Sequence, residues 1–279
     1  MRSLRSEFPV STLCRVLGVP RSTASYSARS TVPEDLTILK DAIQTFLVTY
    51  RCFGARRMYE LLRTLSVAST RRQVRQAYLE LGLLKKRPGP KVRTTNSNHD
   101  GPYFPNLVKS LVVERPDQVW VGDVTYLRVG SRFAYLALLM DVCTRQIVGW
   151  SLESFLGVRL ALQALEVALA TGRRPEIHHS DRDGAYASRQ YVERLEACGA
   201  KSSMTAPDKP EENGYAERLN RTIKEEEAYQ SDYRTVQEAR NAMGEFVRYY
   251  NEKRIHSSLG YRTPSAVFRE WLDQHRGRA

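Results

Sequence analysis

Three acidic residues, Asp123, Asp181 and Glu217, stand at positions where folding alone would not place them. Asp123 lies within residues 119–126, where apolar residues at both alternating positions predict a strand covered on both faces. An unpartnered polar group buried there costs roughly 2–7 kcal/mol. A bound cation would offset this cost, and so would an arginine partner or backbone amides. The residues alone leave these alternatives open.

Asp181 lies at the carboxyl end of a short strand predicted over residues 176–180. That edge of an α/β sheet is where binding sites are built. A turn-forming aspartate is the alternative, and Asp183, just before Gly184, fits that description equally.

Glu217 lies near the start of a helix predicted over residues 214–228. Arg221 and Lys224 follow it at the spacing that places all three on one helix face. Such a face could hold a metal ion through the glutamate and a DNA phosphate through the two cations. An exposed Glu–Arg pair, worth a few tenths of a kcal/mol, is the alternative.

Carboxylate oxygens are the ligands that Mg²⁺ prefers, and it usually takes one or two of them together with substrate phosphates. Two such ions about 3.5–4 Å apart can activate an attacking oxygen and stabilise the leaving one during displacement at phosphorus. The three acids would supply the ligands for that chemistry. An activated water would cut DNA, and a DNA 3′-hydroxyl in its place would join two strands.

The elements that must position these acids follow from apolar periodicity and turn residues. The predicted strands are residues 119–127, 133–142 and 146–152, forming an antiparallel meander, followed by 176–180 and 201–205. The predicted helices between and after them are residues 156–171, 188–198, 214–228 and 236–252. The order indicates a mixed α/β domain.

The positive charge is concentrated in front of this domain. Residues 1–100 hold 18 of the 43 Lys and Arg but only 7 of the 31 Asp and Glu, which leaves the remainder almost neutral. Two helix-turn-helix candidates lie there, residues 11–17 with 21–26 and residues 56–65 with 70–81. Such a one-sided charge is typical of a protein that contacts a polyanion. A structural helical hairpin with a solvated basic face is the alternative.

Three segments are therefore expected: a helical DNA-binding region over residues 1–84, a basic linker over 85–112 and a catalytic domain over 113–279. The basic residues expected to contact DNA, besides Arg221 and Lys224, are Arg56, Arg57, Arg71, Arg72, Arg75, Lys85, Lys86 and Arg87.

Neither a membrane span nor a secretory signal is expected, because no apolar run is long enough. The four cysteines form no Cys-x-x-Cys pair, which disfavours a zinc knuckle or a disulfide framework. A cytoplasmic protein is expected.

In its motifs and their order along the sequence, the chain resembles the OrfB-type transposases of bacterial insertion sequences. These transposases belong to the DDE superfamily, which includes retroviral integrases. The 35 residues between Asp181 and Glu217 match the superfamily's carboxylate spacing. The matching stretches are residues 53–57, 81–83, 119–126, 147–150, 179–182, 216–218, 249–251, 254–261 and 263–264. The resemblance covers essentially the whole chain.

The resemblance implies a ribonuclease H-like core, preceded by a small all-α helix-turn-helix region. It implies that Asp123, Asp181 and Glu217 bind two Mg²⁺ ions, with Mn²⁺ able to substitute, and catalyse cleavage and strand transfer of double-stranded DNA at element ends and target. It further implies a homo-oligomer, at least a dimer on DNA, and a bacterial protein associated with the nucleoid. An upstream-frame helix-turn-helix protein is a further expected partner, since the chain itself has no sustained heptads.

One departure from the family pattern is Asp183, a spare acid where relatives often have glycine. Two other spare acids are interpreted as a strand-end or turn residue, Asp141, and as part of a mobile loop near the site, Asp208. The alternatives for function are a DNA-binding regulator without catalysis and a ribonuclease H-type nuclease that cuts without joining. A DNA-binding regulator would explain the positive charge of residues 1–100 but not an aspartate inside a strand that is apolar on both faces.

Overall fold

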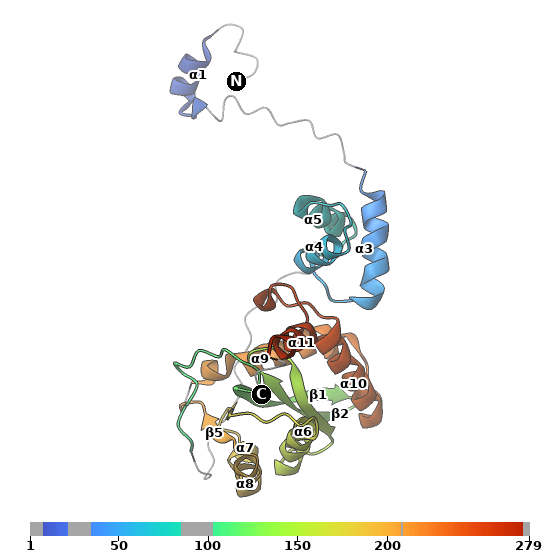
Figure 1. Ribbon diagram of the computed structural model, residues 1–279. Coiled ribbons are helices and arrows are strands. Elements are labelled where there is room, and N and C mark those ends of the chain that lie inside the picture. Colours follow the sequence, from blue (N-terminus) through green and yellow to red (C-terminus); the bar gives the residue numbers. More distant parts are fainter. Residues whose placement is uncertain (1–7, 22–34, 85–102, 208, 276–279) are drawn as a thin grey trace.

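The computed structural model describes residues 8–21, 35–84, 103–207 and 209–275, arranged as Figure 1 shows. A five-stranded sheet of order β3-β2-β1-β4-β5 forms the centre. Its strands are β1 (Val119–Val129), β2 (Arg132–Asp141), β3 (Ile147–Glu153), β4 (Ile177–Ser180) and β5 (Lys201–Met204). The first three run antiparallel, and β4 and β5 run parallel to β1. The predicted meander and the mixed fold class are confirmed.

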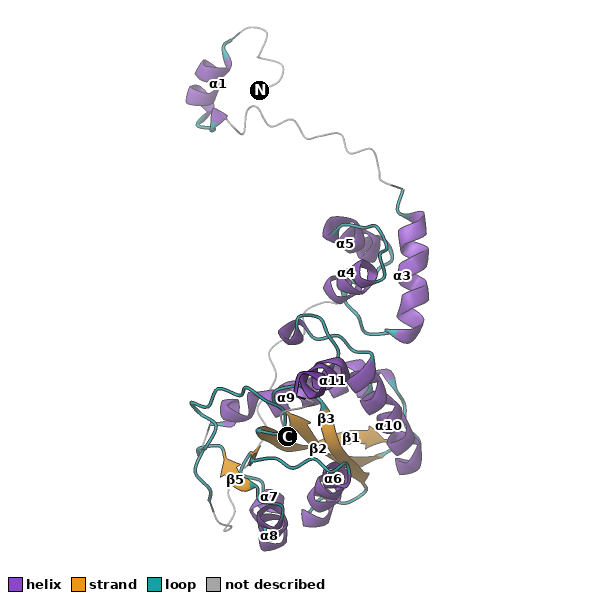
Figure 2. Cartoon of the chain, in the orientation of Figure 1, coloured by secondary structure: helices purple, strands orange, loops and turns teal. Residues whose placement is uncertain are grey.

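Helices cover both faces of the sheet (Figure 2). One layer consists of α6 (Val158–Ala170), α7 (Gly184–Ala187) and α8 (Arg189–Ala197), and the other contains α9 (Gly214–Glu226) and α10 (Val236–Glu252). Short 3-10 turns lie at Pro210–Asn213, Ala228–Gln230 and Ser257–Leu259, and α11 (Pro264–His275) follows. On β1, Val119 and Val121 pack toward α9 and α10, whereas Trp120 packs toward α6 and α8. This strand is therefore covered on both faces, as its apolar pattern predicts.

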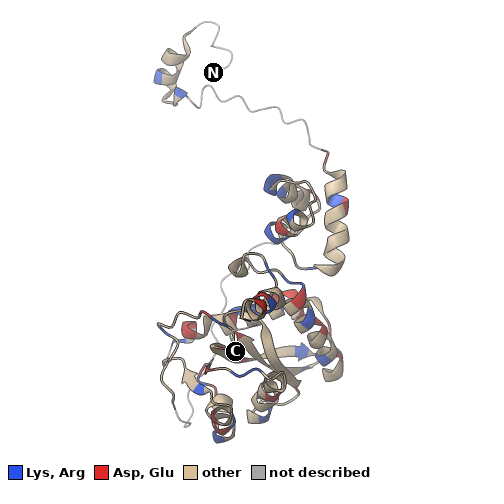
Figure 3. Ribbon diagram, viewed as in Figure 1, with Lys and Arg blue, Asp and Glu red and all other residues tan. Residues whose placement is uncertain are grey.

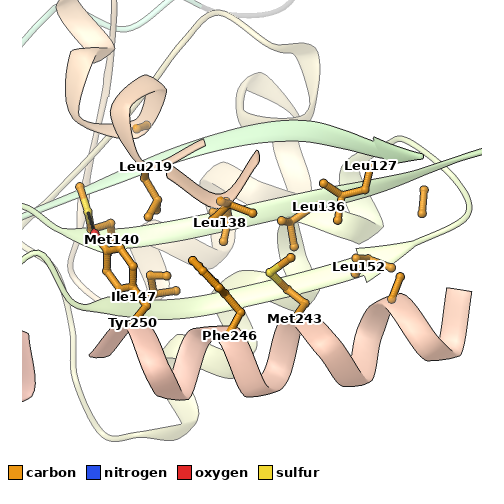
Figure 4. Close-up of a cluster of buried hydrophobic side chains, with 14 of the residues drawn as sticks. Leu127, Leu136, Leu138, Met140, Ile147, Leu152, Leu219, Met243, Phe246 and Tyr250 are labelled. Carbon is orange, nitrogen blue, oxygen red and sulfur yellow. Dashed lines mark hydrogen bonds between the residues drawn. The ribbon is translucent and has the colours of Figure 1, made fainter. Parts of the chain in front are cut away.

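The core between the sheet and α10 is drawn in Figure 4. Leu136 and Leu138 of β2 meet Met243 and Phe246 of α10 there, and all four side chains are buried. Each such side chain contributes roughly 1.5–3 kcal/mol by leaving water. This packing makes the sheet a rigid platform for the residues at its edge.

The opposite layer approaches the sheet most closely at Gly149 of β3. A Cβ atom there would lie 2.2 Å from the carbonyl oxygen of Ala164 in α6. The absence of a side chain at this position therefore lets the helix backbone pack directly on the strand.

A separate helical core precedes the sheet domain. It is formed by α3 (Thr37–Thr49), α4 (Ala55–Thr64) and α5 (Arg71–Glu80), and α1 (Val10–Leu17) comes before them. Thr70 begins α5 with a reciprocal capping box to Gln73. Ile255, from the C-terminal segment, completes this core.

The predicted helix pair α4 and α5 is confirmed, whereas three helices were absent from the sequence-based prediction. They are α3, whose preceding residue Leu36 has no side chain that could cap it, the four-residue α7, and α11. Burial of Ile43 against the other helices of this unit stabilises α3. Except for Arg21, the predicted helix 21–26 lies outside the described residues, and so do linker residues 85–102 and Asp208.

Candidate active site

The sheet places Asp123 and Asp181 next to each other. In the parallel pairing of β1 and β4, Gly122 lies opposite Ser180, and the two aspartates are the residues that follow. Adjacent strands are about 4.8 Å apart. Two acids that are distant in the chain therefore meet at one edge of the sheet.

Asn220 connects α9 to Asp123. Its Nδ2 donates a hydrogen bond of 2.7 Å to Oδ2 of Asp123. Glu217 lies three residues earlier, which places it on the neighbouring part of the helix surface, and its side chain is exposed. One side of α9 thus carries both a hydrogen-bond partner of Asp123 and the third predicted carboxylate.

A second amide fixes the start of the same helix. Nδ2 of Asn213 donates a hydrogen bond of 3.1 Å to the carbonyl oxygen of Gly122. Sequence reasoning missed both Asn213 and Asn220. Their signal is the seven-residue spacing, which puts two polar side chains on one helix face beside an apolar strand.

The pKa of the Asp123 carboxyl is raised well above its ordinary value. Burial is the largest cause, and the negative charge of Asp181 is the next. Glu217 and Asp183 raise this pKa further, while the hydrogen bond from the Val124 N–H opposes them at 2.8 Å. The acids thus repel one another electrostatically at Asp123, and a cation among them would relieve the repulsion.

In the described part of the chain, no three His, Cys, Asp or Glu side chains are grouped closely enough to hold a metal ion. A three-carboxylate site therefore needs a side-chain movement. The exposed Glu217 is the acid with room to make it.

Two of the spare acids have clear structural partners. Asp183 begins α7 by accepting a hydrogen bond of 2.8 Å from the Ala185 N–H. Asp141 is fully buried and accepts hydrogen bonds from the N–H and hydroxyl of Thr144 and from the N–H of Asp117. Asp141 is thus a strand-end residue, as expected.

A buried, neutral histidine, His178, packs against β1 beside the site. A Cβ on Gly122 would lie 2.8 Å from Nε2 of His178, the ring of which also contacts the Tyr191 hydroxyl at 3.1 Å. Burial, followed by the effect of His179, lowers the pKa of His178 to about 3. His178 is therefore an uncharged packing residue at neutral pH.

The predicted DNA-contacting residues have different surroundings. Arg221 is exposed on α9, and Lys224 lies 4.5 Å from the centre of the Tyr126 ring. Lys85, Lys86 and Arg87 lie outside the described residues.

The helical unit carries the remaining predicted contacts, and Figure 3 marks its basic residues in blue. Arg56, Arg72 and Arg75 are exposed. Arg71 is also exposed but pairs with Glu60 at 2.9 Å, and the half-buried Arg57 pairs with Glu226 at the same distance. The paired arginines thus also have a structural role.

Two integrase core domain models match the chain, over residues 113–210 and 198–264. The transposase for insertion sequence element IS629 of Shigella sonnei is 30% identical over 94% of this chain and 92% of its own length. The uncharacterized 31 kDa protein of insertion element IS600, also from Shigella sonnei, is 32% identical over 94% of this chain and 99% of its own length. The magnesium complex of the HTLV-2 integrase catalytic core (trimeric form) is 18% identical, with a TM-score of 0.46 over 55% of this chain and 97% of that one.

The chain belongs to the family of insertion-sequence transposases that carry an integrase core domain. The family resemblance seen in the motifs is thereby confirmed, and DNA transposition is the function of this family. Among the described helices, none combines the length and the apolar character that crossing a membrane requires.

Proposed function

We propose that this transposase cuts and joins DNA at a site formed by Asp123, Asp181 and Glu217, with Mg²⁺ as the cofactor. The observation that carries the proposal is that Asp181 and α9 both lie next to Asp123. The register between β1 and β4 places Asp181 beside Asp123, and α9 contacts Asp123 through the Asn220 hydrogen bond.

The donor set fits the cofactor. All three side chains offer hard carboxylate oxygens, which suit Mg²⁺ or Mn²⁺. Burial, followed by the negative charge of Asp181, raises the pKa of Asp123, and a bound cation would oppose both effects. When bound, two such ions would activate the attacking oxygen and stabilise the leaving one.

The chain's own residues would position the reaction. Asn220 holds one oxygen of Asp123, and the Val124 N–H holds the other. Arg221 and Lys224 lie one and two turns beyond Glu217 on α9, where they can hold a phosphate of the DNA strand. Joining one DNA end to another requires two ends, which favours at least a dimer, and an upstream-frame helix-turn-helix protein stays a predicted partner.

The test uses the full chain and a DNA duplex from the flanks of its own coding sequence. Nicking and joining should require Mg²⁺ or Mn²⁺. Asp123→Asn, Asp181→Asn and Glu217→Gln should each lower activity by roughly a thousandfold or more. Asp232→Asn, which changes an exposed aspartate, should leave activity unchanged.

Three outcomes would count against the proposal. Activity that survives Asp123→Asn or Glu217→Gln would remove the carboxylate assignment. Hydrolysis without any joined product on a good target would indicate a nuclease. DNA binding without either reaction would indicate a regulator.

A further inference from the structure

A cavity of ≈ 640 Å³ opens where the helical unit meets the sheet domain. Its walls come from the start of α4, from α9 and from the segment that follows α10. The residues that line it include Gly54, Arg56, Arg57, Arg145, Tyr215, Arg218, Arg254 and His256.

The lining is strongly basic. Five arginines line the cavity, and the described lining residues include no Asp or Glu. Glu226 pairs with Arg57 at 2.9 Å and with Arg254 at 2.8 Å. The other three, Arg56, Arg145 and Arg218, form no ion pair with any described residue. Uncompensated positive charge therefore faces a single cavity.

Two of these arginines also have buried nitrogens that lack a hydrogen-bond acceptor. They are Nη1 of Arg57 and Nη1 of Arg145, considered against the described residues. The guanidinium of Arg145 lies 4.0 Å from the centre of the Tyr215 ring, which fixes its orientation. A buried donor without an acceptor is costly, and an anion in the cavity would satisfy it.

The start of α4 adds backbone donors to the same cavity. Gly54 precedes the helix and makes no side-chain cap hydrogen bond, and the amino end of the helix, where backbone N–H groups favour an anion, lines the cavity. Burial, followed by the charges of Arg254 and Arg57, lowers the pKa of His256 to about 3. His256 is therefore neutral at physiological pH.

We propose that this cavity, the arginine pocket, binds a backbone phosphate of the DNA substrate and thereby couples the helical unit to the catalytic domain. Guanidinium groups match phosphate oxygens in pairs, and several cations together suit a polyanion. Arg218 directly follows Glu217 on α9, so the pocket borders the helix that carries one of the predicted carboxylates. This inference rests on the proposed function, because it takes DNA as the ligand.

The test measures binding of the full chain to a fluorescein-labelled duplex from the flanks of its coding sequence, in EDTA so that no reaction occurs. The double variant Arg145→Gln/Arg218→Gln should bind roughly tenfold more weakly, with a salt-dependence slope reduced by about one. Neither arginine has an ion pair that folding needs. Arg132→Gln/Arg189→Gln, which changes two exposed arginines away from the pocket, is the charge-matched control and should lose little affinity.

A second measurement identifies the phosphate. A neutral methylphosphonate is moved along one strand of the duplex, one position at a time. At the position that occupies the pocket, the substitution should weaken binding by the wild type but not by the double pocket variant. The pocket and control variants could instead lose equal affinity, with no methylphosphonate position that weakens binding by the wild type alone. That result would mean that the arginines act only through their general positive charge, and it would overturn the proposal.

These results are separable from those of the proposed function. A wild type that cuts and joins DNA while the pocket variant binds normally would defeat only the pocket. A pocket variant that loses binding, in a protein with no metal-dependent reaction, would defeat only the catalytic assignment.

Discussion

Asn220 donates a 2.7 Å hydrogen bond to Oδ2 of Asp123, across 97 residues of chain. This bond joins the helix that carries Glu217 to the strand that carries Asp123. The acceptor is a carboxylate whose pKa is raised by burial and by the neighbouring acids. Asn220 is therefore a positioning residue for the proposed site.

Replacing Asn220 with alanine should raise the Mg²⁺ concentration needed for half-maximal activity by roughly 10–100-fold, as loss of a ligand's hydrogen-bond partner typically does. The measurement is activity against Mg²⁺ concentration, with thermal unfolding in parallel. Asn241→Ala, which changes an exposed asparagine on α10, is the control. A lower melting temperature with an unchanged Mg²⁺ midpoint would assign Asn220 a purely structural role.

Asp123→Asn should stabilise the fold at neutral pH while it abolishes activity. The folded protein binds a proton at Asp123 more tightly than the unfolded chain does, because the folded pKa lies above 3.8. The resulting loss of stability develops as pH rises above 3.8 and is complete above the folded pKa. The variant, which cannot ionise, should melt about 2–4 °C higher at pH 7.

This advantage should shrink as pH falls toward 3.8, and Mg²⁺ should reduce it by stabilising only the wild type. Melting curves over that pH range, with and without Mg²⁺, provide the check. A variant that melts lower than the wild type at pH 7 would contradict the electrostatic interpretation.

Glu226→Gln should destabilise the protein by about 3–5 kcal/mol, because it leaves Arg57 and Arg254 without their buried carboxylate. Burial by itself raises the pKa of Glu226, but Arg254 and Arg57 outweigh it, so the pKa is lowered below 4.5. The stability it contributes is thus present above pH 4.5 and is lost as pH falls through the folded pKa. Denaturant unfolding measures both effects.

The control for this change is Glu166→Gln, which breaks an exposed pair with Arg194. Exposed pairs contribute about 0–1 kcal/mol. Equal losses in the two variants would mean that Glu226 does not hold the helical unit to the sheet domain.

Gly149→Ala should destabilise the protein by about 1–3 kcal/mol, because the new methyl group meets the Ala164 carbonyl oxygen. Gly184→Ala is the matched control, since a Cβ there meets no atom within 4 Å. Denaturant midpoints compare the two. A neutral Gly149→Ala would show that α6 can shift away from β3 at little cost.

Local patterns predict much of this protein. The two-sided apolar run around Trp120 predicts a covered strand, and Thr70 predicts the start of α5, because strand burial and helix capping depend on residues close in sequence. The helix α3 was not predicted, and the packing of Ile43 against the other helices, which stabilises it, depends on residues distant in the sequence.

By itself the sequence determined the order of strands and helices, the basic front and the family to which the chain belongs, all of which are carried by residue type and spacing. Only the tertiary structure decided which polar groups meet. The contact of Asn220 with Asp123 depends on how α9 packs on β1, and the three-way contact of Glu226 with Arg57 and Arg254 depends on how the helical unit docks. Contacts between distant segments arise from strand register and helix packing, which no local pattern of residues specifies.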